Sequence, residues 1–106
     1  MKNETPAHLF KILSLENWEA SQNREVVSLP PMDDLFIHLS REDQLEKILK
    51  KYWSDAQKFV ILKIETEKLV GKLELEKNPG GTSKFFHLYE GYIPLSSVID
   101  FKIVSR

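Results

Sequence analysis

The stretch KFVILKI, residues 58–64, is a nearly continuous run of apolar and β-branched residues. A run of this kind is typical of a strand that is buried on both faces, so we expect it to form the central strand of a sheet. Shorter apolar or alternating segments on either side predict its neighbours. These further strands are expected over residues 8–13, 35–40, 72–76, 84–93 and 97–104.

Two helices are predicted between these strands. Ser14 is a suitable N-cap for a helix over residues 15–22. The sequence SRED, residues 40–43, fits a capping box and predicts that Ser40 begins a second helix. That helix carries one apolar stripe, which consists of Leu45, Ile48, Leu49, Tyr52 and Trp53.

The connections between the later strands also carry signals. Gly71 is expected to end a helical turn over residues 66–71, and KNPGG, residues 77–81, is expected to form a turn. The strands and helices do not follow a regular βαβ alternation. The sequence therefore predicts an α+β fold with a mixed or antiparallel sheet and two main helices.

Length and composition narrow the class of protein. The 106 residues suit a single domain over 1–106, and 15 basic against 16 acidic residues give a net charge of −1. This balance argues against a dedicated nucleic-acid-binding protein, and no apolar run is long enough to cross a bilayer. The first ten residues lack the features of a signal peptide, and the absence of cysteine excludes disulfides and thiolate chemistry. We expect a cytoplasmic protein.

Two of the three histidines lie within apolar strands that have the same pattern. Because side chains alternate along a strand, each strand places an aromatic ring, an imidazole and a hydroxyl on one face. The two sets are Phe36, His38 and Ser40, and Phe85, His87 and Tyr89. Apolar walls with a few convergent polar groups are typical of small-molecule sites, so we expect both imidazoles to line one cleft.

Simpler interpretations of the same residues remain open. A histidine in an apolar strand is often a packed ring that is hydrogen-bonded to a neighbouring carbonyl group. Ser40 can serve only as a helix cap, and Glu76 alternates with Glu74 as on any strand that faces solvent. A metal site is the least favoured alternative, since no HxH or HExxH spacing is present and His8 lies near the N-terminus.

The segments LFIHLSREDQL, residues 35–45, and LELEKNPGGTSKFFHLYEG, residues 73–91, together resemble a bacterial family known as domain of unknown function 952 (DUF952). The resemblance extends over nearly the whole chain. It departs from the family pattern at Leu35, Leu75 and Phe86, where the family usually has glycine, tryptophan and proline. The residues that stay in register are His38, Ser40, Gln44, Glu76, His87 and Tyr89.

This family is similar in fold to the ADP-ribosyltransferases, which implies a split sheet around a cleft and NAD or a related nucleotide as ligand. The resemblance implies catalytic roles for His38, Glu76 and His87. Glu76 would stabilise an oxocarbenium-like state, and a histidine would move a proton. The residues expected to bind the ligand are Phe36, Ser40, Arg41, Phe85 and Tyr89.

Two functions are therefore considered. The first is an enzyme that acts on a nucleotide-like small molecule by glycosyl or ADP-ribosyl transfer. The second is a non-catalytic module that binds a small ligand or a peptide in the same cleft. The sequence does not identify a cofactor more closely than NAD or a related nucleotide, and it does not predict the oligomeric state.

Overall fold

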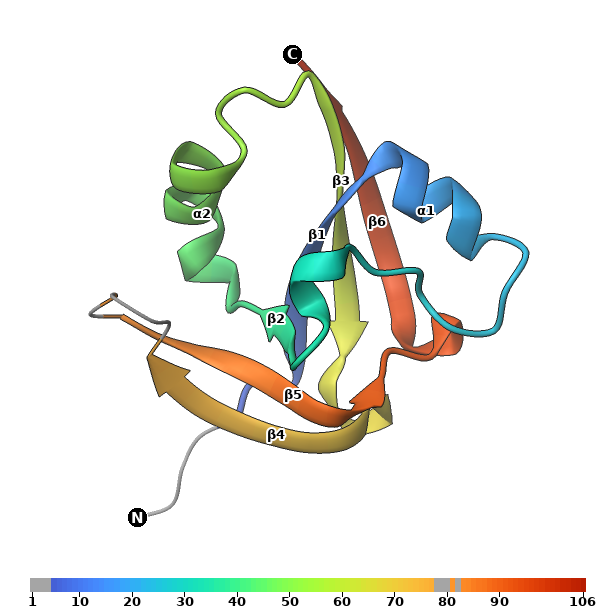
Figure 1. Cartoon of the computed structure of the whole chain (residues 1–106), viewed down its shortest axis with the longest axis vertical. Coiled ribbons are helices and arrows are strands. Elements are labelled where there is room, and N and C mark those ends of the chain that lie inside the picture. Colours follow the sequence, from blue (N-terminus) through green and yellow to red (C-terminus); the bar gives the residue numbers. More distant parts are fainter. Residues whose placement is uncertain (1–4, 78–80, 82) are drawn as a thin grey trace.

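Two three-stranded antiparallel sheets form the framework of the protein (Figure 1). A computed structural model describes residues 5–77, 81 and 83–106. The first sheet has the order β1-β3-β6, and the second has the order β2-β5-β4. The bounds are β1 (His8–Ser14), β2 (Ile37–Leu39), β3 (Lys58–Glu65), β4 (Val70–Lys77), β5 (Lys84–Tyr92) and β6 (Val98–Ser105). The predicted α+β class is confirmed, and every pairing between these strands is antiparallel.

The strand β3 lies at the centre of its sheet, as the apolar run predicts. Its residues Val60, Leu62 and Ile64 are fully buried on the face that points toward the second sheet. On the opposite face Phe59 is buried, whereas Ile61 and Lys63 are only half-buried. The expectation of a strand buried on both faces is therefore wrong for that second face.

One short bridge joins the two sheets. The Phe10 amide donates to the Ser40 carbonyl at 2.8 Å, and the Ser40 amide donates to the Phe10 carbonyl at 3.0 Å. This bridge follows β2 directly and fixes that strand beside β1. The core that fills the space between the sheets includes Leu9, Leu13, Trp18, Ile37, Leu39, Val60, Leu62, Phe86 and Leu88.

The first helix, α1 (Leu15–Ser21), forms as predicted, with the Ser14 side chain accepting a hydrogen bond from the Asn17 amide. The second helix, α2 (Leu45–Tyr52), begins later than predicted. Ser40 is not its cap, because the bridge to Phe10 holds Ser40 in an extended pairing. A 3-10 turn at Glu42–Gln44 precedes the helix, and the Gln44 side chain accepts from the Arg41 amide at 2.9 Å.

The helix α2 stands away from the sheets, and none of its residues is fully buried (Figure 1). Ile48, Tyr52 and Trp53 of its apolar stripe line the cavity described below. No helix within the described ranges is long and apolar enough to cross a membrane.

The prediction that Gly71 ends a helical turn is wrong. The turn is a short 3-10 segment at Thr66–Lys68, and Gly71 lies inside β4 with φ of +128°. A Cβ atom on Gly91, which is packed against it, would lie 1.7 Å from the Val70 carbonyl oxygen. Backbone contact, rather than a helix end, therefore requires these glycines. The turn expected over residues 77–81 falls mostly outside the described residues.

We expect Gly91→Ala to destabilise the protein by about 3 kcal/mol, because the backbone of β4 must move to admit the added methyl group. Urea unfolding would measure the change. Lys72→Ala, an exposed change on the same strand pair, should stay within about 0.5 kcal/mol. Equal stabilities for the two variants would contradict the close approach of the two strands.

Candidate functional site

The two strand histidines meet across the sheet. His38 on β2 pairs directly with His87 on β5, and their ring centroids are 5.4 Å apart in an edge-on arrangement. Phe36, which lies just before β2, contacts both rings at centroid distances of 4.8 and 4.2 Å. The side chain of His38 is 34% exposed, whereas that of His87 is 1% exposed. The two rings meet, but the expectation that both line one open cleft is wrong for His87, which is sealed from solvent.

A buried ion pair that the sequence analysis missed holds His38 in place. Asp33 Oδ1 lies 2.7 Å from His38 Nδ1, and Asp33 Oδ2 lies 2.6 Å from Lys11 Nζ. Lys11 also donates to the His38 carbonyl at 2.9 Å. Since an ionised carboxylate only accepts hydrogen bonds, His38 Nδ1 carries the proton. In the neutral ring the lone pair then lies on Nε2.

Electrostatics keep Asp33 charged in this buried position. Burial raises the pKa of Asp33, but the hydrogen bond from His38 and the charge of Lys11 outweigh it, so that the pKa is lower than 3.8. Burial lowers the pKa of Lys11, and the attraction of Asp33 opposes this effect. The three groups therefore form one coupled cluster of a lysine, a carboxylate and an imidazole.

A cavity of about 240 Å³ opens beside this cluster. It lies between β1, β2 and the apolar stripe of α2, whose Ile48 and Tyr52 form part of its wall. The complete lining is Phe10, Lys11, Ile12, Pro30, Asp33, His38, Leu39, Ser40, Ile48, Tyr52, Trp53 and Phe85. A cavity of about 150 Å³ can hold benzene, and drug-sized ligands usually need about 300–1,000 Å³. This cavity therefore suits one flat ring system.

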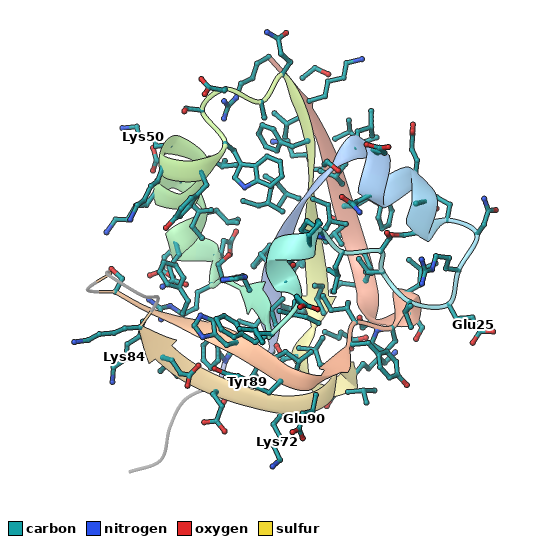
Figure 2. All side chains as sticks on the ribbon, in the orientation of Figure 1. Glu25, Lys50, Lys72, Lys84, Tyr89 and Glu90 are labelled. Carbon is teal, nitrogen blue, oxygen red and sulfur yellow. The ribbon has the colours of Figure 1, made fainter. Side chains whose placement is uncertain are left out.

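A second carboxylate–imidazole pair adjoins the first, because the His87 ring contacts both His38 and Phe36. Glu76 Oε1 is 2.8 Å from His87 Nδ1 and accepts a hydrogen bond of 2.5 Å from the Tyr89 hydroxyl. The hydrogen bond from Tyr89, followed by that from His87, lowers the pKa of Glu76, and the same bond to Glu76 raises the pKa of Tyr89. Figure 2 marks Tyr89 on β5. The Glu76 side chain is 40% exposed, so an ionised carboxylate reaches solvent here.

The predicted site residues thus divide into three groups. His38, Ser40 and Phe85 line the cavity. Phe36, Glu76, His87 and Tyr89 form the adjoining cluster, in which Phe36 stacks on His87. Arg41 lies outside the cavity lining and pairs with Asp43, with Nε 3.0 Å from Oδ1.

The geometry gives no support for a metal centre in residues 5–77, 81 and 83–106, where no three acidic or histidine side chains converge to hold an ion. The groups that the cavity offers to a ligand are instead an imidazole nitrogen, a hydroxyl and aromatic faces. These groups suit proton transfer and ring stacking.

Comparisons with known proteins agree with the resemblance found in the sequence. The profile of a family described as protein of unknown function (DUF952) matches residues 12–101. The crystal structure of protein CC0527 from Caulobacter crescentus is similar, with 31% identity, a TM-score of 0.75 and coverage of 91% of this chain and 84% of that chain. Its solution NMR structure gives 29% identity, a TM-score of 0.76 and coverage of 92% and 84%. No curated protein matches the chain. The likeness to ADP-ribosyltransferases stays a prediction.

We expect Asp33→Asn to destabilise the protein by about 3–5 kcal/mol at pH 7, because it leaves the Lys11 charge buried without its counter-ion. Asparagine keeps the shape of the side chain, so the loss reports the charge. Chemical denaturation would measure it. In the double variant that also carries Lys11→Met, no unpaired charge is buried, and much of the stability should return.

The same pair predicts the pH dependence. The pKa of Asp33 is lower in the folded protein than its ordinary value of 3.8, so its stabilising effect is complete above that pH and is lost as pH falls through the folded pKa. The difference in stability between wild type and Asp33→Asn should therefore shrink as pH drops below about 4. A difference that is constant with pH would show that Asp33 is not the stabilising charge.

Proposed function

The chain belongs to the DUF952 family, and we propose that the cavity beside His38 is a small-molecule site in which the His38–Asp33 pair accepts a proton from the bound reactants. The observation that carries this proposal is the orientation of His38. Asp33 fixes Nδ1 as the protonated nitrogen, which leaves Nε2 as the basic atom of the ring. The ring itself forms part of the cavity wall.

The walls favour a flat, ring-containing ligand. Phe10, Tyr52, Trp53 and Phe85 give the cavity aromatic faces on β1, on α2 and just after it, and on β5. Its volume of about 240 Å³ admits a nicotinamide or a nucleobase but not a whole dinucleotide. We therefore propose NAD or a related nucleotide as the ligand class, with one ring inside the cavity and the remainder outside.

The corresponding reaction is transfer of a glycosyl group to water or to a hydroxyl group. The acceptor O–H gives its proton to His38 Nε2 while its oxygen forms the new bond to the ribose carbon. The ribose–nicotinamide bond breaks, and its electron pair leaves with the neutral nicotinamide. Glu76, which Tyr89 and His87 hold ionised, is our candidate for stabilising the positive charge that develops on a ligand extending out of the cavity.

Binding without catalysis is the second candidate, and one observation favours it. Lys11, a cation in the cavity wall, is occupied by Asp33 and by the His38 carbonyl. It therefore has little capacity to bind a phosphate group. A protein that only holds an aromatic ligand, or an aromatic side chain of a peptide, would need no such contact.

Calorimetry and thermal shift with NAD, ADP-ribose, adenosine and nicotinamide would test the site, and chromatography would follow nicotinamide release. We expect a ring-containing ligand to raise the melting temperature by a few degrees at concentrations well above its Kd. Ile48→Trp, which adds bulk at the α2 wall of the cavity and leaves His38 unchanged, should abolish this shift.

His38→Ala should lower turnover about 10²–10⁴-fold and change ligand affinity by less than about tenfold. His8→Ala is the matched control, since His8 lies outside the cavity lining. Binding that persists in Ile48→Trp would exclude the cavity as the site. Binding by wild type without any product would exclude the catalytic reading and favour the binding module.

A further inference from the structure

The strand β6 forms the outer edge of the first sheet, and within the described residues no other strand pairs with its free side (Figure 1). Three large apolar side chains on it are about half exposed, namely Ile99 (47%), Phe101 (49%) and Ile103 (50%). Edge strands with exposed apolar residues are sites where another chain can add a strand. What that chain must look like can be worked out from β6 itself.

The backbone of β6 turns every second residue of its regular part toward this free side. The Arg106 amide donates to the Gln57 carbonyl of the neighbouring chain segment, so even-numbered residues turn their amides toward β3. Odd-numbered residues then turn theirs outward. In agreement, the Phe101 amide donates to its neighbouring Asp100 side chain rather than to β3.

The sequence of the strand reads VIDFKIV over residues 98–104, which is nearly symmetric about Phe101. In an antiparallel pair of two such strands centred on this residue, Phe101 faces Phe101 of the second copy. Ile99 then lies opposite Ile103. Asp100 faces Lys102, an opposite charge, and this attraction occurs twice because of the two-fold symmetry.

We propose that two copies of this chain associate through antiparallel pairing of β6, which joins their sheets into one sheet of six strands. In this register the outward amide of Phe101 exchanges its bond to the Asp100 side chain for one to the Phe101 carbonyl of the second copy, as an antiparallel ladder requires. The Asp100 carboxylate is then available to Lys102 of the second copy. The apolar side chains meet on one face, beside Trp18, whose ring lies 4.9 Å from that of Phe101.

The charges also select this register. A shift that centres the pair on Asp100 places two aspartates opposite each other, and a shift that centres it on Lys102 does the same with two lysines. A shift by one residue turns the apolar side chains to the wrong face. The bulge between the pairings of Lys63 and Ile64 leaves Ile99 without a partner on β3, whereas residues 100–105 keep a regular ladder. Asp100, Phe101 and Lys102, which form the centre of the proposed pair, lie within that regular part.

Sedimentation equilibrium from about 1 to 200 µM tests the dimer, and we expect a concentration-dependent dimer for the wild type. Asp100→Lys and Lys102→Asp each place like charges opposite each other, and each should raise the dimer Kd at least about tenfold. The double variant with both changes should return to the wild-type Kd. An equimolar mixture of the two single variants should form a mixed dimer, because one then carries two positive and the other two negative side chains.

Lys58→Asp is the matched control for Lys102→Asp, because it makes the same change in net charge at an exposed site on β3 and should leave the Kd unchanged. Circular dichroism would establish that every variant is folded. Hydrogen exchange of the wild-type Ile103 amide, which should slow as concentration rises, is a second measurement that needs no variant. A monomeric wild type at 200 µM, single variants that dimerise like the wild type, or single variants that fail to associate when mixed would each overturn the proposal.

Discussion

The buried ion pair between Lys11 and Asp33 determines the arrangement of the site. Lys11 points from β1 into the space between the sheets, and Asp33 comes from the 3-10 turn Pro31–Asp33. Neither charge can be removed from water at low cost unless the other is present. The pair therefore ties the turn to the sheet. Asp33 also accepts hydrogen bonds from the backbone amide and from the ring nitrogen Nδ1 of His38. The ion pair therefore sets the direction of the imidazole as well.

The site contains two carboxylate–imidazole pairs with different surroundings. Asp33 is buried, ion-paired and bonded to a histidine whose ring faces the cavity. Glu76 is partly exposed and is bonded to a histidine that is itself sealed from solvent. The two pairs therefore offer different atoms to a ligand. The first pair offers an accessible imidazole nitrogen, and the second offers an accessible carboxylate. Phe36 stacks on His87 and also contacts His38, so this one ring packs against both pairs.

Much of the fold could be predicted from local pattern. The strands, the Ser14 cap and the face of its own strand on which each histidine lies follow from alternation and capping chemistry. Ser40 shows where local pattern fails, because its pairing with Phe10, thirty positions away, overrides a good capping box. The glycine at position 71 was assigned to a helix end for a related reason: its neighbour Gly91 is close in space but distant in sequence.

The Lys11–Asp33 ion pair, whose residues are 22 positions apart, was not predicted from the sequence. The sequence does carry a signal for Lys11, because Lys11 shares one face of a predicted strand with Leu9 and Leu13. A lysine at a core-facing position needs a buried partner. The sequence does not indicate which of its acidic residues is that partner, since that depends on how the segment around Pro30 and Pro31 folds over the strand.

The two outer strands of the first sheet have different roles, and this connects the fold to the site. The edge at β1 is used within the chain: the bridge from Phe10 to Ser40 attaches the second sheet there, and the cavity forms at the same place because α2 spans the gap without closing it. The edge at β6 is separated from the cavity by β3 and keeps its outward hydrogen-bonding groups. Pairing of β6 with another strand therefore leaves the cavity open. One small sheet can in this way support a ligand site at one edge while its opposite edge stays available for pairing.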